Sequence, residues 1–196
     1  MMRQANVERQ TKETNVSVCV NLDGEGKADV STGIGFFDHM LVLFAKHSQV
    51  DLVVKAQGDL ETGDHHTVED VGIVLGQAIG KALGEKRGIF RYGEAKIPMD
   101  EALAESVLDL SGRPFFVYWA DFTNDFVGSF STQMTGEFFR SLSLQAGMTL
   151  HLSCLYGQND HHKIEALFKA FALSFRRAAA IDAQAGDEIP SSKGML

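Results

Sequence analysis

Residues 64–69, Asp-His-His-Thr-Val-Glu, return 96 positions later as residues 160–165, Asp-His-His-Lys-Ile-Glu. At about 100° of rotation per residue, a helix that begins at His65 or His161 places both histidines and the glutamate on one side. Apolar residues take the opposite arc of both copies: Val68, Val71, Leu75, Ile79, Ile164, Leu167, Phe171 and Phe175. The repeat therefore predicts two amphipathic helices that pack with one face and bind with the other.

Metal binding is the chemistry that this repeat favours. A single histidine on a helix is more often a packed or solvated residue, but here two imidazoles and a carboxylate recur together with the same apolar stripe. Asp64 and Asp160 are expected to cap the two helices, and the positive end of each helix dipole disfavours imidazolium. A neutral imidazole is the form that binds a metal ion.

The composition is that of a globular protein that folds around one core. The chain has 196 residues, of which 44% are hydrophobic and 22% charged. Its net charge of −8 argues against a nucleic-acid partner. No apolar run of membrane-spanning length occurs, and residues 1–6 do not resemble a signal peptide, so we expect a cytoplasmic protein without a membrane partner. Cys19 and Cys154 lack the spacing of a metal knuckle and are expected to be reduced core residues.

The order of predicted elements repeats along the chain. Expected strands and helices follow the hydrophobic periodicity: strand 15–22, helix 37–44, strand 50–56 and a helix from 65, then strands 105–110 and 115–121, helix 132–146, strand 148–154 and a helix from 161. Aligning the two halves places Glu13-Thr14 near Glu105-Ser106, and His39 against Glu137.

These elements predict an α+β fold in a single domain, residues 1–196, built from two half-repeats at roughly 7–90 and 97–182. Four helices are expected between two mixed, mostly antiparallel, four-stranded sheets. Gly72, Gly76 and Gly80 recur every four residues, which predicts a close helix neighbour along that stripe. Residues 183–196 show no periodicity and are expected to form a flexible tail.

The two halves together contribute eight candidate metal ligands: His39, His65, His66, Glu69, Glu137, His161, His162 and Glu165. Eight ligands exceed the needs of one ion, and adjacent histidines on a helix diverge too far to serve the same one. We therefore expect two ions, each with mixed nitrogen and oxygen donors. The absence of thiolates argues against a closed structural zinc site, and manganese, iron and zinc all remain compatible.

Six stretches resemble the imidazoleglycerol-phosphate dehydratases of histidine biosynthesis, and the resemblance covers about residues 9–196. The stretches are Arg9-Gln10-Thr11-Lys12-Glu13-Thr14, Gly35-Phe36-Phe37-Asp38-His39-Met40-Leu41, Gly63-Asp64-His65-His66-Thr67-Val68-Glu69-Asp70, Asn159-Asp160-His161-His162, Phe168-Lys169-Ala170-Phe171 and Pro190-Ser191-Ser192-Lys193-Gly194. One position departs from the family pattern, because many members have His where this chain has Glu137.

The resemblance implies a ribosomal S5 domain 2-like fold and a lyase that uses two Mn²⁺ ions per subunit. The implied reaction removes water from D-erythro-imidazole glycerol phosphate and gives imidazole acetol phosphate, through an imidazolate held between the two ions. It also implies trimers that build a 24-subunit shell, in which neighbouring chains complete each metal site.

Site roles follow from the same resemblance. Glu13 is the implied catalytic proton carrier. Substrate contacts are expected from Glu13, His39, His47, His65, His66, Glu69, Arg91, Arg113, His161, Lys169, Ser191, Ser192 and Lys193. Within this set the arginines, Lys169 and the tail residues are expected to bind the phosphate, with the tail acting as a lid. His47 is either a buried structural residue or a residue that contacts the substrate through a neighbouring side chain, and the sequence leaves both interpretations open.

Two other functions fit the same residues. A dinuclear hydrolase of phosphate esters would also use two metals and basic side chains, and would release free phosphate rather than a ketone. A shell with purely structural ions would bind metal without turnover and would not depend on Glu13.

Overall fold

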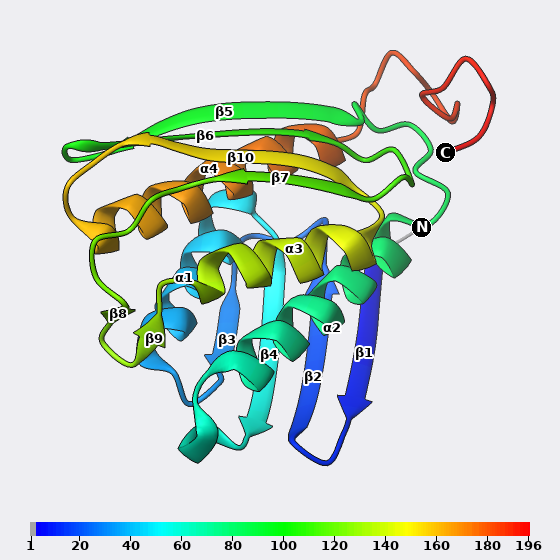
Figure 1. The fold of residues 1–196 in the computed structure, drawn as a ribbon. Coiled ribbons are helices and arrows are strands. Elements are labelled where there is room, and N and C mark those ends of the chain that lie inside the picture. Colours follow the sequence, from blue (N-terminus) through cyan, green and yellow to red (C-terminus); the bar gives the residue numbers. More distant parts are fainter. Residues whose placement is uncertain (1–2) are drawn as a thin grey trace.

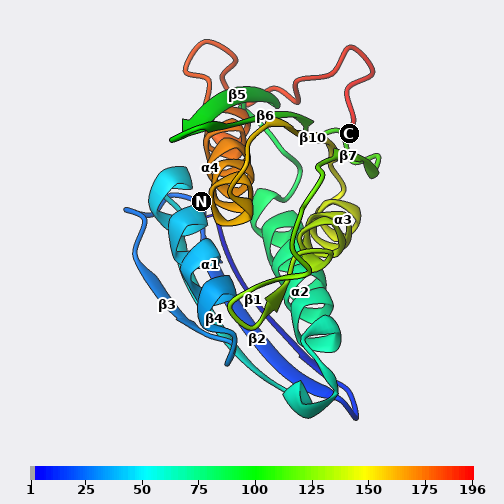
Figure 2. The same ribbon diagram turned by 60° about the vertical axis from the view of Figure 1, so that its left-hand side comes forward.

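The computed structural model describes residues 3–196, which form two four-stranded sheets with helices between them (Figures 1 and 2). The first half contains β1 (Gln4–Gln10), β2 (Thr14–Asn21), β3 (Ala28–Ser31), α1 (Gly35–Ser48), β4 (Asp51–Gly58), the short 3₁₀ helix η1 (Leu60–Thr62) and α2 (His65–Leu83). The second half contains β5 (Tyr92–Met99), β6 (Ala102–Asp109), β7 (Phe115–Trp119), β8 (Phe126–Val127), β9 (Phe130–Ser131), α3 (Met134–Ala146), β10 (Thr149–Tyr156) and α4 (Asp160–Ala179). The predicted α+β fold is confirmed.

The two sheets have the same topology. Their strand orders are β1-β2-β4-β3 and β5-β6-β10-β7. In each sheet the last pair is parallel and the other two pairs are antiparallel. A parallel pair needs a crossover, which α1 and α3 provide. The small hairpin of β8 and β9 has no counterpart among the described residues of the first half.

The helices pair across the halves, α2 with α3 and α1 with α4. A Cβ atom on Gly72 would lie 2.8 Å from the carbonyl oxygen of Phe138, and one on Gly76 would lie 2.5 Å from that of Leu142. Only glycine permits this approach of α3, which confirms the predicted close helix neighbour. The α1–α4 contact is aromatic, with the rings of Phe44 and Phe171 stacked at 5.5 Å.

Alternation along the strands places the core between the sheets. In β2 the side chains of Val16, Val18 and Val20 are buried, while Cys19 points outward and is exposed. The expectation that Cys19 is a core residue is therefore wrong, because successive strand residues face opposite sides. Cys154 is buried as expected, and both thiols are free. No helix within residues 3–196 is long and apolar enough to cross a bilayer.

The two predicted aspartate caps are not formed. Asp64 stands at the N-cap of α2, but its carboxylate accepts a hydrogen bond from the Ser131 amide at 2.6 Å instead of capping the helix. Asp160 is the first residue of α4, and the Asn159 side chain caps that helix by accepting from the amides of His161 and His162. The Asp160 carboxylate is already engaged by the Lys163 ammonium at 2.9 Å.

Candidate active site and metal centre

The first motif copy lies in the first turns of α2. His65 and Glu69 are one helical turn apart, and the His65 Nε2 atom lies 3.6 Å from a Glu69 carboxylate oxygen. Both side chains are partly exposed to solvent. This local pair is what the i, i+4 spacing predicts, because residues four apart share a helix face.

The second copy joins a histidine from the other half. Within residues 3–196, three ligand atoms of His39, His161 and Glu165 lie within 4.8 Å of one another. The Glu165 Oε2 atom is 3.2 Å from His161 Nε2 and 3.7 Å from His39 Nε2. Helix α1 brings His39 to this place because it packs against α4. Two imidazole nitrogens and a carboxylate oxygen therefore converge where a divalent cation fits.

Glu137 lies on α3 and faces the first motif copy across the α2–α3 contact. The Arg140 guanidinium joins its carboxylate, at 2.8 Å, to that of Glu69, at 3.3 Å. Two candidate ligands from different halves thus approach one another with a cation between them. Sequence reasoning missed Arg140, although its i+3 spacing from Glu137 is a signal for an ion pair on a helix.

The second histidine of each copy points away from the first. The ring planes of His65 and His66 are 83° apart, and those of His161 and His162 are 80° apart. His66 Nδ1 lies 3.1 Å from both carboxylate oxygens of Asp59.

His162 Nδ1 lies 2.7 Å from a carboxylate oxygen of Glu101. Neither Asp59 nor Glu101 was among the predicted site residues. No local sequence pattern marks either of them, since both contacts form only in the tertiary structure.

These carboxylates act on the charge of the histidines in the direction opposite to the helix dipole. A hydrogen bond to Asp59 raises the pKa of His66, and a hydrogen bond to Glu101 raises the pKa of His162. The carboxylates thus favour the protonated form of both imidazoles. Hydrogen bonds from the Asn159 amide and from His162 lower the pKa of Glu101 to about 2. A metal ion at either histidine must compete with a proton.

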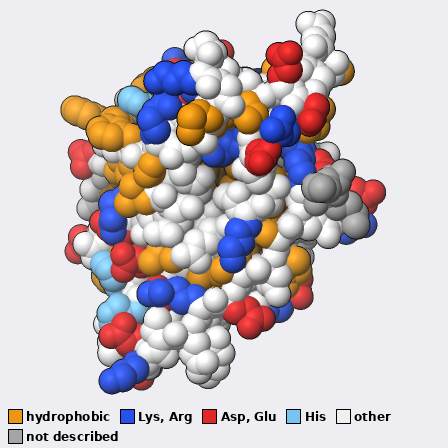
Figure 3. All heavy atoms as spheres, turned by 90° about the vertical axis from the view of Figure 1, so that its right-hand side faces the viewer, with side chains coloured by type: hydrophobic (Ala, Val, Ile, Leu, Met, Phe, Trp, Pro, Cys, Tyr) orange, Lys and Arg blue, Asp and Glu red, His pale blue; other side chains and the backbone are white. Residues whose placement is uncertain are grey.

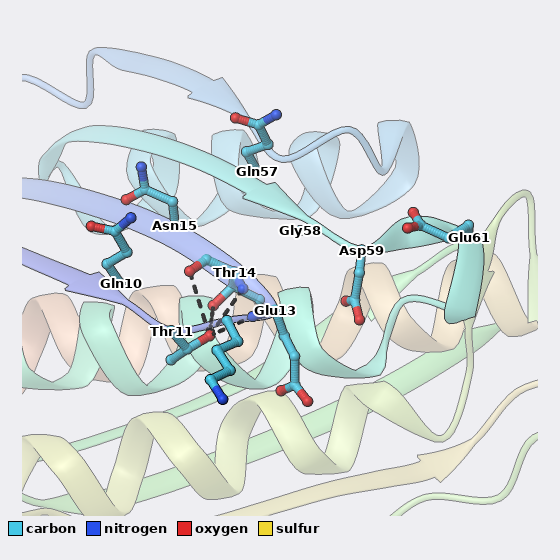
Figure 4. A pocket seen from close by; sticks show the side chains of 10 residues that line it. Gln10, Thr11, Glu13, Thr14, Asn15, Gln57, Gly58, Asp59 and Glu61 are labelled. Atoms are coloured by element: carbon cyan, nitrogen blue, oxygen red, sulfur yellow. Dashed lines mark hydrogen bonds between the residues drawn. The ribbon is translucent and has the colours of Figure 1, made fainter.

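Glu13 lies in the turn between β1 and β2, in a polar cavity of about 420 Å³ (Figure 4). Its side chain is 57% exposed, and its Oε2 atom is 3.9 Å from His66 Nδ1. The Thr11 hydroxyl accepts from the Glu13 amide at 3.1 Å, and the Asp59 amide donates to the Glu13 carbonyl at 3.1 Å. The backbone of Glu13 is thus fixed by hydrogen bonds, while its exposed carboxylate lies near His66 of the first motif copy.

A buried carboxylate on α2 anchors this turn. Asp70 accepts from Arg9 Nε at 2.9 Å and from the Thr14 hydroxyl. Arg9 and Thr14 flank Glu13 in the quoted stretch 9–14, so their contacts explain why that stretch stays beside the His-His motif.

The arginines and tail residues predicted to bind phosphate lie at the opposite end of the molecule. The tail lies beside the start of β5, whereas α2 and α4 begin at the other side of the molecule (Figure 1). Arg91 is buried there, with two hydrogen bonds to Asp109 at 2.7 and 3.0 Å and one to the Pro190 carbonyl at 2.8 Å. Arg113 is exposed, next to Gly112, where a Cβ atom would lie 2.8 Å from Leu196.

Several Lys and Arg side chains lie in the upper part of the face in Figure 3, the part that includes the tail. The chain turns at Ser191, whose hydroxyl accepts a hydrogen bond from the Lys193 amide at 3.2 Å. Ser192 lies within the same turn. One chain therefore does not bring these residues to its own histidines.

Lys169 and His47 lie near the second copy instead. The Lys169 ammonium is 2.6 Å from Glu165 Oε1, on the side of the carboxylate that does not face His161. Burial is the main cause that lowers the pKa of His47, and the positive charge of Lys169 lowers it further. His47 is half-buried on α1, two turns beyond His39, so it is a neighbour of the site rather than part of the convergent group.

Comparison with known proteins agrees with this geometry. The family model described as imidazoleglycerol-phosphate dehydratase matches residues 32–175. A protein of that name from Methanosarcina mazei is 56% identical over 195 residues, covering all of both chains, and one from Rhodopseudomonas palustris (strain BisB5) is 54% identical over all of this chain and 99% of its own. The chain belongs to the imidazoleglycerol-phosphate dehydratase family.

A solved imidazoleglycerol-phosphate dehydratase from Staphylococcus aureus subsp. aureus N315 has the same fold. It matches with a TM-score of 0.83 at 39% identity, over 91% of this chain and 99% of its own. As a dehydratase of this family, the chain is an enzyme, a lyase of histidine biosynthesis. The family assignment covers the whole chain, including both motif copies and the turn that contains Glu13.

Proposed function

We propose that this chain dehydrates D-erythro-imidazole glycerol phosphate to imidazole acetol phosphate in the cytoplasm, with two Mn²⁺ ions per subunit. The observation that carries this proposal is the convergence of His39, His161 and Glu165 from both halves of a chain that matches the family over its whole length. The reaction breaks one C–H and one C–OH bond, releases water and forms an enol, which becomes the ketone.

The donors of this chain fit manganese. The convergent group offers two imidazole nitrogens and one carboxylate oxygen without a thiolate, which suits a metal with mixed nitrogen and oxygen ligands. The candidate ligands for two ions are His39, His65, His66, Glu69, Glu137, His161, His162 and Glu165. When bound, two ions would act as Lewis acids on the two ring nitrogens of the substrate.

Glu13 is the residue that we assign to proton transfer. Its carboxyl group is exposed beside His66, and within residues 3–196 it is not part of the convergent group of His39, His161 and Glu165. The carbon that loses its proton has no adjacent carbonyl group, so a positioned base is needed to receive that proton.

Self-association explains how phosphate-binding residues reach the histidines. In a single chain, the tail and the start of β5, which Arg91 precedes, lie at the opposite end from the starts of α2 and α4 (Figure 1). The outer face of the second sheet exposes Phe115 and Trp119, the latter 74% exposed. An exposed apolar sheet face is typical of an interface. We propose trimers that build a 24-subunit shell and complete each site with residues of neighbouring chains.

The tail is proposed as a lid over the substrate phosphate. The tail provides two hydroxyl groups and one ammonium group, from Ser191, Ser192 and Lys193. No helix or strand lies in residues 190–196. Removal of residues 190–196 should raise KM with little change in metal content.

Product analysis tests the proposed reaction directly. Purified protein loaded with Mn²⁺ is incubated with imidazole glycerol phosphate, and ketone and free phosphate are both measured. Formation of imidazole acetol phosphate supports the proposal, whereas release of free phosphate would show a phosphate-ester hydrolase. Metal binding without either product would show structural ions.

A further inference from the structure

The strand pairing identifies Glu101 as the counterpart of Glu13. Strands β2 and β6 each have eight residues. The last residue of β2 opposes the first of β4, and the last residue of β6 opposes the first of β10. The residue just before β2 is Glu13 and the residue just before β6 is Glu101. The sequence-based match of Glu13 with Glu105 is therefore wrong by four residues. The match of His39 with Glu137 agrees with the structure, because each residue lies the same number of positions before the last residue of its helix.

The two equivalent glutamates have different surroundings. Glu101 Oε1 accepts from the amides of Gln158 and Asn159 at 2.9 and 2.7 Å, and its Oε2 atom lies 2.7 Å from His162 Nδ1. Glu13 lies 3.9 Å from His66 Nδ1, beyond hydrogen-bond distance. The Glu101 carboxylate is thus held by hydrogen bonds on both oxygens, whereas the Glu13 carboxylate has only a longer-range contact with His66.

In the first half, Asp59 takes the place next to the histidine. Both of its carboxylate oxygens lie 3.1 Å from His66 Nδ1. Each second histidine of the repeat therefore has a carboxylate on Nδ1, although the two carboxylates come from different positions of the fold. A carboxylate on one ring nitrogen fixes the tautomer and orientation of an imidazole and leaves the other nitrogen for a metal ion.

The backbone around Glu101 adds to this rigidity. Asp100 and Glu101 form a two-residue turn between β5 and β6, and Asp100 has a φ of 46°. A left-handed conformation costs energy for a residue other than glycine and persists where its surroundings require it. The turn holds Glu101 in line with the amides that precede α4.

We propose that Glu101 and Asp59 are positioning residues, which orient His162 and His66 by binding Nδ1 and leave Nε2 for a metal ion, and that Asp59 leaves Glu13 available to carry protons. An Asp100 carboxylate oxygen lies 3.7 Å from His162 Nε2, so this nitrogen faces a second carboxylate of the same turn. This inference rests on the proposed function for the metal and for Glu13. The division of tasks explains why equivalent glutamates in the two halves are not used alike.

Glu101→Gln is the main test. An amide keeps the size of the side chain, but it can present an oxygen to the Gln158 and Asn159 amides only by turning its NH₂ group toward His162. His162 must then accept at Nδ1 and carry its proton on Nε2, which blocks the metal. We expect Mn²⁺ to bind 10- to 100-fold more weakly, measured by titration of metal-free protein with the EPR signal of free Mn²⁺. The matched control is Glu105→Gln, which alters a half-exposed glutamate on the same strand that pairs with Lys96.

Two further variants separate positioning from folding. Asp59→Asn should weaken Mn²⁺ binding by a similar factor through His66, and it remains informative if Glu101→Gln does not fold. Glu13→Gln should leave Mn²⁺ affinity unchanged. The thermal unfolding of the metal-free variants is measured in parallel, since a merely structural role would lower the Tm without a selective loss of metal affinity.

The outcomes distinguish this inference from the proposed function. Parental Mn²⁺ affinity in both Glu101→Gln and Asp59→Asn, in a parent protein that dehydrates the substrate, overturns the positioning roles alone. A parent that binds Mn²⁺ but forms no ketone overturns the proposed function, and weaker binding in the two variants would still support the positioning of the histidines.

Discussion

The two copies of the His-His-x-x-Glu motif share their sequence but differ in their surroundings. In the second copy the Glu165 side chain is 8% exposed and is held by Lys169 at 2.6 Å. In the first copy the Glu69 side chain is 32% exposed and reaches Arg140 at 3.3 Å. The open cavity with Glu13 adjoins the first copy.

This difference teaches that a repeated motif can serve two purposes in one site. The glutamate of the second copy is buried and paired with Lys169, whereas the glutamate of the first copy is more exposed and Glu13 lies near that copy. Duplication supplies matching side chains, and the rest of each half gives them different neighbours.

The largest expected difference between the halves concerns Glu13. A Glu13→Gln change should lower kcat by at least about a hundredfold, because an essential proton carrier contributes 10²- to 10⁴-fold. KM and metal content should stay nearly the same. Steady-state kinetics with imidazole glycerol phosphate measure the effect, with Glu25→Gln, an exposed glutamate that pairs with Lys27, as the control. Turnover within a few-fold of the parent would assign the proton to another group.

The next difference concerns the stability of the metal-free protein. Glu165→Gln leaves the partly buried Lys169 without its counter-ion, so the free energy of unfolding should fall by about 2–3 kcal/mol. Glu69→Gln breaks a more exposed pair and should cost less than about 1 kcal/mol. Urea unfolding of both variants gives the comparison. Equal losses would mean that the two copies are enclosed alike.

The start of α4 should lose stability in acid. Burial alone would raise the pKa of Asp160, but hydrogen bonds from Lys163 and from the Asn124 and Thr123 amides lower it to about 2. Because this folded-state pKa lies below the ordinary value of 3.8, the carboxylate stabilises the fold above about pH 4 and loses this effect as the pH falls toward 2. The contribution is about 2 kcal/mol.

Asp160→Asn should therefore destabilise the metal-free protein at pH 6 and less so at pH 3, as measured by urea unfolding across that range. A difference between variant and parent that stays constant with pH would contradict the role of the ionised carboxylate.

The smallest expected difference concerns the helix caps. Asn159→Ala removes the side chain that caps α4 and should lower the free energy of unfolding by about 1 kcal/mol. The Asp64 side chain does not cap α2, so Asp64→Ala should act through its hydrogen bond to the Ser131 amide instead. Hydrogen exchange at the first turn of each helix separates the two cases, with faster exchange expected in α4 for Asn159→Ala.

Much of the fold could be predicted from periodicity, and the failures have a physical cause. The alternating valines of β2 and the apolar stripes of α2 and α4 were recognised because one face of each element is fully buried. The edge strands β1, β3 and β5 were missed. β1 buries only Val7, β3 has four residues with none fully buried, and β5 buries only Gly93 and Ala95. A strand with few buried side chains shows little hydrophobic alternation in its sequence.

The candidate site was predictable only where ligands lie on one helix. The pairs His65 with Glu69 and His161 with Glu165 follow from the i, i+4 spacing. The carboxylates of Asp59 and Glu101 lie in turns whose residues show no periodicity, so only the packing of turn against helix reveals them.

The sequence by itself determined the two amphipathic helices, the duplicated fold and the ligand types, because helical spacing and hydrophobic alternation act over a few neighbouring residues. Tertiary structure alone decided which residues meet. The crossing of α1 to α4 and of α3 to α2 brings His39 to Glu165 and Glu137 toward Glu69. The strand pairing makes Glu101, and not Glu105, the residue equivalent to Glu13 in the second half. Such contacts join residues far apart in the chain, and their geometry depends on how whole elements pack around a common core.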